Sequence, residues 1–276
     1  ANSPKNGVTK PAPRHIRELT YDAIVPITER DAGQYEEIWK AWNKDAPMPV
    51  PMHVANAGID PEVMQEIVAP ADLVSLFYLG ALDWHPNLDG LNWFLDHVWP
   101  IVHNRYPNVQ FHIAGKGMPH ELKNSSRKNV VMHGEVKDAY AYMRERAIMV
   151  VPIFMGSGMR VKIIEGMALG KAIVATAMAV EGLKVRHGNH LFITDDPREF
   201  ADCISVLIEK PGMLEVIGRH AAQYSRSVFD NHAIIEKLLA FYEKLIGERK
   251  KKKQEAEEAA KKAAEKEKEK DKEKKK

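Results

Sequence analysis

The sequence has little of several features that would define its class at once. It contains a single cysteine, Cys203, which excludes an internal disulfide and fits a reducing compartment. No run approaches the roughly 18 apolar residues that a membrane-spanning helix needs, and the first residues lack the apolar core of a signal peptide. We therefore expect a soluble, cytoplasmic protein without a stable membrane span.

Most of the chain also lacks an excess of positive charge. Residues 249–276 hold 14 Lys and Arg against 8 Asp and Glu, whereas the other 248 residues hold 26 against 30. Because nucleic-acid-binding domains usually show a concentrated basic face, we expect no nucleic-acid partner. The histidines show no metal-ligand spacing, and no GxSxG, Walker or HExxH motif is present, so the sequence predicts no metal site.

An alternation of apolar strand patterns with helix patterns is present from Leu73 onward. Helices are expected to begin at Pro86, Pro197 and Pro211, and the first of them to run to about Tyr106. The expected strands are residues 73–79, 109–114, 130–133, 148–154, 172–176 and 191–194. This rhythm predicts an α/β fold with a Rossmann-like, doubly wound parallel sheet, in which ligands bind beyond the carboxyl ends of the strands.

The two ends of the chain have other patterns. Residues 21–28 and 52–56 are expected to form short strands, with a helix over residues 29–43 between them. A helix with an apolar face is expected from Phe229 to Ile246. The Lys/Glu/Ala tract at 250–276 has high helix propensity but no apolar face, so it is either a solvated single helix or disordered. We expect three regions, at 1–62, 63–247 and 248–276.

The loop after the strand at 148–154 is rich in glycine. Gly156 and Gly158 flank Ser157, and a pair of glycines lets the backbone approach a ligand closely. The amides at the start of the helix that follows favour an anion. By itself Gly156-Ser157-Gly158 is equally well explained as a tight turn.

Charged residues follow this loop directly. Arg160 and Lys162 place two cations in the first turn of the helix, where positive charge opposes the helix dipole unless an anion is bound. Glu165 comes one turn later, and its carboxylate can accept both hydroxyls of a ribose. The combination predicts a nucleotide diphosphate at the helix N-terminus, although solvated charges around a simple turn are the alternative.

Five segments, in this order, resemble the motifs of a known family. They are FYLGALDWHPNLDGLNWF, YPNVQFHIAGKG, VVMHGEV, VVPIFMGSGMRVKIIEGMALGKAIVATAMAVEGL and HLFITDDPREFADCISVL. Residues 21–246 are thereby similar to the group 1 glycosyltransferases of GT-B fold, a retaining family with a paired-glutamate motif. In that family the C-terminal domain binds a sugar nucleotide, the N-terminal domain binds the acceptor, and no metal or prosthetic group is required.

The resemblance also implies roles for the residues of the loop and helix. Glu165 matches the second glutamate of the family motif, which binds the nucleotide ribose, whereas the first glutamate falls at Ser157, so this copy departs from the pattern. Many relatives place an Arg and a Lys just after the glycine that corresponds to Gly80, to bind the diphosphate. Here those positions are Ala81 and about His85. Arg160 and Lys162 are therefore expected to bind the phosphates and to stabilise charge on the leaving diphosphate, as in relatives with a GxGxRxK loop.

Further donor-binding positions follow from the same resemblance. Gly134 and Val136 match the place where backbone groups meet the base, and Gly115 with Lys116 lies beside it. Simple turn glycines are an equal alternative for these positions. Trp84, in contrast, is expected to pack around the first helix together with Trp93 and Trp99.

The implied function is that of a donor domain for a UDP- or GDP-sugar, with hexosyltransferase-like activity. The resemblance identifies residues 1–62 as a remnant of the acceptor domain and its linker, because only twenty residues precede Tyr21. The chain is then either a fragment of a longer enzyme or dependent on a partner that supplies the acceptor half. One alternative is a non-catalytic nucleotide-sugar-binding or scaffold domain. Another is a different Rossmann-like enzyme, against which the lack of Gly-x-Gly-x-x-Gly after the first strand argues.

Overall fold

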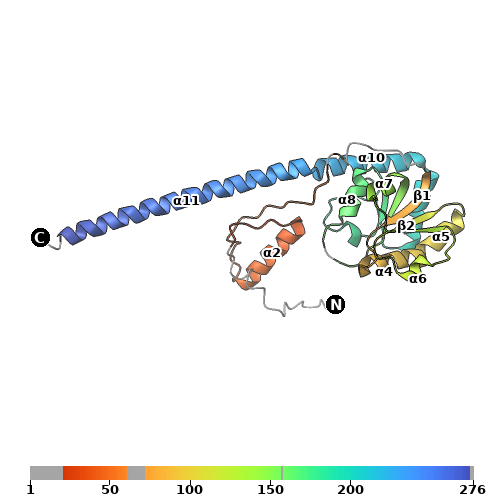
Figure 1. Cartoon of the computed structure of the whole chain (residues 1–276), viewed down its shortest axis with the longest axis horizontal. Helices are drawn as coiled ribbons and strands as arrows, with labels where there is room; N and C mark the ends of the chain where they lie inside the picture. The colour runs from red at the N-terminus through yellow and green to blue at the C-terminus, as the bar shows by residue number, and fades with distance from the viewer. Residues whose placement is uncertain (1–20, 61, 63–71, 157, 274–276) are drawn as a thin grey trace. The chain divides into compact units, whose positions relative to one another are not determined.

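The computed structural model describes residues 21–60, 62, 72–156 and 158–273 (Figure 1). The chain divides into two compact units. Unit 2 comprises Ile27–Asp31 and Asn56–His232, and the remaining described residues belong to unit 1. The expected region boundaries at 62/63 and 247/248 stay predictions.

Unit 2 is built on one parallel sheet with the strand order β3-β2-β1-β4-β5-β6. Its strands are β1 (Asp72–Leu79), β2 (Phe111–Ala114), β3 (Val130–Gly134), β4 (Arg146–Val151), β5 (Ala172–Ala175) and β6 (Phe192–Ile193). Every residue of β4 and β5 is buried, as expected for strands that helices cover on both faces. The prediction of a doubly wound α/β sheet is confirmed.

Two hydrophobic clusters lie on the two faces of this sheet. Successive side chains of a strand point to opposite faces, so Leu76 belongs to one cluster and Phe77 to the other. Phe94, Phe111 and Phe200 pack in the first cluster with Leu76. The second cluster contains Phe77 together with Ile163, Ile164 and Met167 of the helix that follows β4. This second cluster therefore anchors the helix that carries the charged residues of the expected site.

The helix expected from Pro86 to Tyr106 is present but has a break in its hydrogen-bond pattern. It consists of α4 (His85–Trp93), a π-helical turn η1 (Phe94–Val98) and α5 (Trp99–Arg105). Pro100 lies in the first turn of α5 and has no amide hydrogen, so the regular α-helical ladder cannot pass through it. The amide of Trp99 instead donates to the carbonyl of Phe94, five residues earlier.

The remaining helices of unit 2 connect successive strands or cover the sheet. They are α6 (His120–Lys123), α7 (Ala139–Arg144), α8 (Val161–Ala168), the 3-10 turn η2 (Met178–Val180), α9 (Pro197–Glu209) and α10 (Pro211–Val228). The starts predicted at Pro197 and Pro211 are confirmed. At the first of these, Asp196 caps α9 by accepting hydrogen bonds from the amides of Arg198 and Glu199, at 2.8 and 3.0 Å.

The prediction of short strands at residues 21–28 and 52–56 is wrong. These segments make one isolated parallel bridge, between Ile24 and Met52. Two hydrogen bonds of 3.1 Å form this bridge: the Ile24 amide donates to the Pro51 carbonyl, and the His53 amide donates to the Ile24 carbonyl. Pro26 and Pro51 have no amide hydrogen to extend the ladder on either side, which explains why no strand forms. The helix predicted between them is confirmed as α2 (Glu29–Trp42).

The C-terminal tract is helical as far as it is described. The single helix α11 (Asn231–Glu273) continues without interruption past Gly247, so of the two forms expected for this tract the solvated helix is the one present. Ion pairs spaced four residues apart, such as Lys251 with Glu255 at 4.0 Å and Lys253 with Glu257 at 3.9 Å, support it. No described helix combines the length and the apolar character that crossing a membrane would require.

Two glycines of α10 give a test of how closely this helix packs. A Cβ atom on Gly218 would lie 2.1 Å from the carbonyl oxygen of Gly170, in the turn that leads into β5. Backbone cannot yield locally to such an overlap, so we expect Gly218→Ala to lower the free energy of unfolding by about 2 to 3 kcal/mol. Urea unfolding followed by circular dichroism measures the change.

Gly212 provides the matched control in the same helix, because no atom lies within 4 Å of its Cβ position. Gly212→Ala should leave the stability equal or slightly raised, since alanine is the better helix former. Equal stabilities of the two variants would contradict the close contact between α10 and the turn before β5.

Candidate functional site

The strand order of the sheet fixes where a ligand can bind. From β1 the chain proceeds to β2 and β3 on one side, and from β4 to β5 and β6 on the other, while β1 and β4 pair directly. At such a reversal the two connections leave the sheet in opposite directions and open a crevice beyond the carboxyl ends of the strands. The segment after β1 and the segment after β4 are therefore the walls of the candidate site.

Three of the predicted glycines meet at the ends of β1, β2 and β3. The Gly80 amide donates to the Ala114 carbonyl at 3.2 Å, and the Gly115 amide donates to the Gly134 carbonyl at 2.8 Å. A Cβ atom on Gly115 would lie 1.8 Å from the Gly80 carbonyl oxygen, so only glycine permits this approach. Gly134 has open space around it but a φ of +69°, which glycine adopts without strain.

Lys116 and Val136, which were also predicted to take part in donor binding, lie near these glycines in the chain. Lys116 has an exposed side chain, and its carbonyl accepts the Leu82 amide at 2.7 Å, which fixes the start of the loop after β1. Val136 is half-buried and packs against the second hydrophobic cluster. The roles assigned to Lys116 and Val136 in donor binding stay predictions.

The loop after β4 curves through two glycines. Gly156 and Gly158 have φ angles of +103° and +90°, a region that residues with a Cβ atom rarely adopt. A Cβ atom on Gly156 would lie 3.1 Å from Nη2 of Arg160 and 3.2 Å from Cη2 of Trp84. The loop therefore passes close against the Arg160 side chain. Ser157, also predicted as a donor-binding residue, lies outside the described residues.

Arg160 occupies the N-cap position of α8 and is only 8% exposed. Its guanidinium lies over the ring of Trp84, 5.3 Å from the ring centroid, and its Nη2 is 3.4 Å from the Met155 carbonyl oxygen. Burial lowers the pKa of Arg160, and the Glu181 carboxylate opposes that shift in part. Trp84, which was expected to pack around the first helix, is the N-cap residue of α4, is 40% exposed and contacts Arg160.

Lys162, in the first turn of α8, reaches across to the end of β1. Its Nζ donates a hydrogen bond to Oδ1 of Asn87 at 3.0 Å and lies 4.8 Å from the centroid of the Tyr78 ring. Nζ also lies 3.0 Å from the point where a Cβ atom on Gly80 would be. Burial, and then the neighbouring Arg160 charge, lowers the pKa of Lys162 to about 7. A second cation thus lies directly above the carboxyl end of β1.

Asn87 orients this lysine, and sequence reasoning missed it. Its Nδ2 donates to the Ala81 carbonyl at 2.8 Å, which turns Oδ1 toward Lys162. Asn87 is only 6% exposed, although it is polar and lies in the first turn of α4. A buried amide at the start of the helix after β1 was the available signal, but its partner, 75 residues further on, could not be read from the sequence.

Glu165 lies one turn further along α8 and is half-buried. Its Oε1 accepts a hydrogen bond from the Tyr140 hydroxyl at 2.9 Å. Burial, followed by this hydrogen bond to Glu165, raises the pKa of Tyr140 to about 12. Nothing in the sequence singled out Tyr140, because the contact joins α7 to α8.

The arrangement can bind an extended anion that also carries hydroxyl groups. Two cations and the amides at the start of α8 lie at the carboxyl ends of β1 and β4, and a carboxylate lies one helical turn away. Within residues 21–60, 62, 72–156 and 158–273, no group of three or more His, Cys, Asp and Glu side chains is placed to hold a metal ion.

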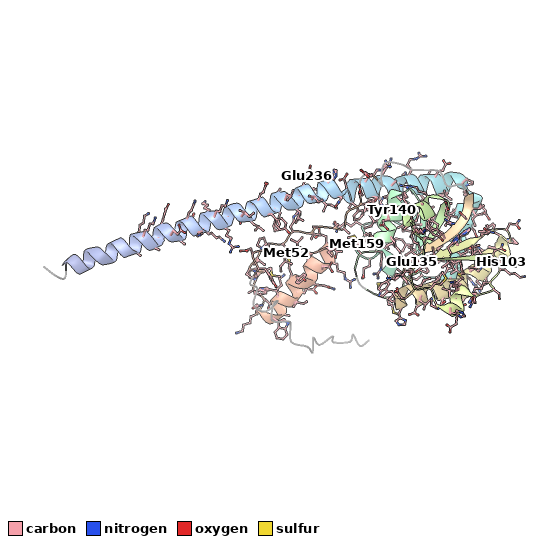
Figure 2. The ribbon with its side chains drawn as sticks, in the orientation of Figure 1. Met52, His103, Glu135, Tyr140, Met159 and Glu236 are labelled. Carbon is pink, nitrogen blue, oxygen red and sulfur yellow. The ribbon has the colours of Figure 1, made fainter. Side chains whose placement is uncertain are left out.

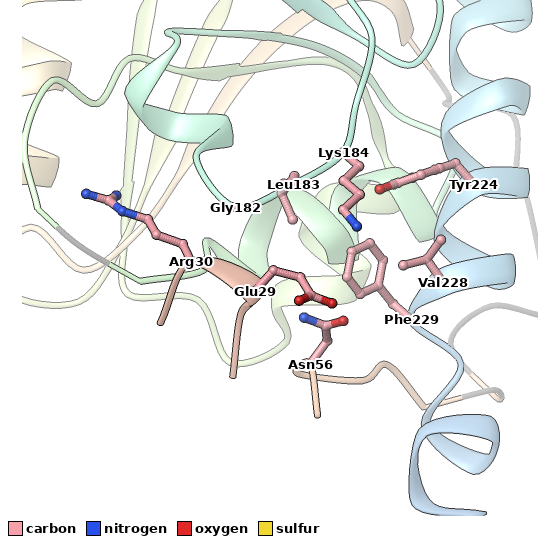
Figure 3. A pocket seen from close by; sticks show the side chains of 9 residues that line it. All are labelled: Glu29, Arg30, Asn56, Gly182, Leu183, Lys184, Tyr224, Val228 and Phe229. Carbon is pink, nitrogen blue, oxygen red and sulfur yellow. The ribbon is translucent and has the colours of Figure 1, made fainter. Parts of the chain in front are cut away.

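Unit 2 has another pocket, of about 320 Å³, that contains none of the predicted site residues (Figure 3). It lies between the start of α2, the segment after η2 and the end of α10. Its lining residues are Glu29, Arg30, Asn56, Gly182, Leu183, Lys184, Tyr224, Val228 and Phe229.

Comparison with known proteins supports the assignment of the fold. Residues 74–210 match the family model described as glycosyl transferases group 1. An uncharacterized 44.6 kDa protein in the cps region of Klebsiella pneumoniae is 24% identical over 173 residues, which cover 59% of this chain and 45% of that protein.

The solved structures that are similar in fold include two complexes with UDP. Anabaena Alr3699/HepE, in complex with UDP, superposes with a TM-score of 0.65 and 16% identity over 81% of this chain and 64% of its own. The pneumococcal O-GlcNAc transferase GtfA, in complex with UDP and GlcNAc, has a TM-score of 0.64 and 15% identity over 84% of this chain and 47% of its own.

The chain thus spans less than two thirds of the length of each of these proteins. The family match lies on the sheet that carries the predicted site, and the similar structures share that sheet with its flanking helices. The protein therefore contains a group 1 glycosyltransferase domain of the GT-B fold.

Proposed function

We propose that unit 2 binds a sugar nucleotide, a UDP- or GDP-sugar, beyond the carboxyl ends of β1 and β4, and that the protein transfers the sugar to an acceptor. The observation that carries this proposal is the position of the Lys162 ammonium over Gly80, with Arg160 beside it at the start of α8. Two partly desolvated cations at a helix N-terminus are unfavourable by themselves, and a diphosphate would compensate both.

Each part of the site has a proposed role. Arg160, Lys162 and the amides at the start of α8 hold the diphosphate, and on transfer the two cations stabilise the charge that develops on the leaving group. Glu165 accepts hydroxyl groups of the ribose. The loop containing Gly156 and Gly158 allows its backbone to approach the phosphates closely.

The base is proposed to lie over the backbone at the ends of β2 and β3. Gly115 and Gly134 leave this backbone without side chains, and Lys116 and Val136 border it. The HepE and GtfA structures are complexes with UDP, which supports UDP as the first nucleotide to test.

The acceptor is proposed to bind to a separate domain, either in a longer form of this chain or in a partner. In this proposal residues 1–62 are a remnant of that acceptor domain and its linker, residues 63–247 are the donor domain, and residues 248–276 are a tail. A cytoplasmic location, expected from the single cysteine, remains part of the proposal.

Removal of either cation should weaken nucleotide binding. We expect Arg160→Ala and Lys162→Met each to lower the affinity for the nucleoside diphosphate by about 30-fold, because each removes a charge-assisted hydrogen bond to phosphate. Isothermal titration calorimetry with UDP, GDP and ADP measures this change and shows which base is preferred.

Lys123→Met, which removes an exposed lysine of α6, is the matched control and should bind as the wild type does. Unchanged affinity in a variant that lacks both Arg160 and Lys162, or no binding of any of the three nucleotides by the wild type, would overturn the proposed site.

Binding should also depend on pH through Lys162. Its pKa is about 7 in the ligand-free protein, and a bound diphosphate favours the charged ammonium, so the pKa rises on binding. As far as Lys162 is concerned, the affinity for the diphosphate is constant below pH 7. Above pH 7 the affinity falls by up to about tenfold per pH unit, until the pH reaches the pKa that Lys162 has in the complex.

Calorimetry between pH 6 and 9 with UDP-glucose tests this expectation, because the charge of its diphosphate does not change over that range. Lys162→Met should remove most of the slope above pH 7. A slope of the same size in the variant would show that another group titrates.

Transfer is proposed to proceed with retention, as the family resemblance implies. It is also proposed to need no metal ion, because Arg160 and Lys162 would supply the positive charge that a metal ion provides in other enzymes. With an acceptor domain present, turnover should persist in EDTA, and NMR of the first-formed product should show the anomeric configuration of the donor. Loss of turnover on chelation that added Mg²⁺ restores, or an inverted product, would contradict these two parts of the proposal separately.

A further inference from the structure

Tyr140 connects α7 to α8, the helix that carries the charged residues of the candidate site. It is the second residue of α7, the helix that follows β3, and is labelled in Figure 2. The start of α7 is fixed by Asp138, whose side chain accepts a hydrogen bond from the Ala141 amide at 2.9 Å. From this fixed position the Tyr140 hydroxyl donates to Oε1 of Glu165 on α8, at 2.9 Å.

The ring of Tyr140 has little freedom to move away from this contact. It is half-buried and packs against the second hydrophobic cluster, as do Val136, before α7, and Met159, before α8. The hydroxyl also stays a donor at neutral pH, because burial and the Glu165 carboxylate hold the pKa of Tyr140 at about 12.

This hydrogen bond has a consequence for Glu165. A glutamate on a helix surface samples several rotamers, and fixing one of them on binding costs entropy. With Oε1 held by Tyr140, the carboxylate is oriented before a ligand arrives, and Oε2 keeps its capacity to accept hydrogen bonds. A neutral donor achieves this without adding a charge that would compete for the phosphates.

We propose that Tyr140 is a positioning residue that orients Glu165 toward the ribose and thereby sets a preference for ribonucleotides over deoxyribonucleotides. This inference rests on the proposed function, since it assumes that Glu165 meets the ribose. The Tyr140 hydroxyl acts through Glu165, so its removal affects only ligands that have the hydroxyl groups which Glu165 accepts.

The test compares each nucleotide with an analogue that lacks both ribose hydroxyls. The affinities of UDP, GDP and ADP, and of their 2′,3′-dideoxy counterparts, are measured by calorimetry for the wild type and for Tyr140→Phe. We expect the wild type to prefer the ribonucleotide. Tyr140→Phe should weaken ribonucleotide binding by about tenfold and leave the dideoxy analogue unchanged, so that the preference decreases.

Two further variants separate positioning from a structural role. Tyr106→Phe is a matched control, because the Tyr106 hydroxyl donates to the Glu209 carboxylate in a like pair between the end of α5 and α9, and it should leave the preference intact. In a Glu165→Gln background, Tyr140→Phe should cause no further loss of preference, since the two residues act through one contact.

The outcomes distinguish this inference from the proposed function. If no nucleoside diphosphate binds the wild type, the proposed function fails. If the nucleotide binds but Tyr140→Phe leaves the preference for ribose unchanged, the positioning role is overturned while the donor site stands. The same holds if Tyr140→Phe lowers the affinities for the ribonucleotide and for its dideoxy analogue equally. A wild type without any preference for ribose also overturns it.

Discussion

The direct parallel pairing of β1 with β4 is the constraint on which the rest of unit 2 depends. Because the chain leaves these two neighbouring strands in opposite directions, their carboxyl ends are left open, and the loops that follow them become the walls of one crevice. Gly115 reinforces the arrangement, since its backbone approaches the Gly80 carbonyl more closely than any side chain would allow. Helix α8 is held against the same sheet by Ile163, Ile164 and Met167, which fixes the position of its N-terminus and of the charged residues there.

The charges in this crevice are arranged for a ligand rather than for stability. Arg160 and Lys162 lie where the helix dipole disfavours cations, and burial lowers the pKa of both. The Trp84 indole lies over the guanidinium, and the Asn87 amide oxygen accepts a hydrogen bond from the ammonium. Asn87 orients the ammonium without neutralising it, so its charge can act on a bound diphosphate.

The parts that sequence reasoning predicted are those that local pattern determines. The apolar runs of β4 and β5 are buried strands, as predicted, and Pro197 and Pro211 begin their helices as expected. Arg160, Lys162 and Glu165 could be found because they follow one loop on one helix. Asn87, Tyr140 and the exposure of Trp84 could not, since each depends on a contact between elements distant in the chain. Near the N-terminus the apolar pattern misled, because prolines removed the amides that strands require.

A crystal structure of the protein with a bound nucleoside diphosphate, UDP first, would show whether the start of α8 is the phosphate site. We expect the diphosphate to lie there, within hydrogen-bonding distance of Lys162 Nζ and the Arg160 guanidinium, with the ribose against the Glu165 carboxylate. A nucleotide located elsewhere, for example in the pocket between α2 and the end of α10, would contradict it. So would a diphosphate in the crevice that contacts neither cation.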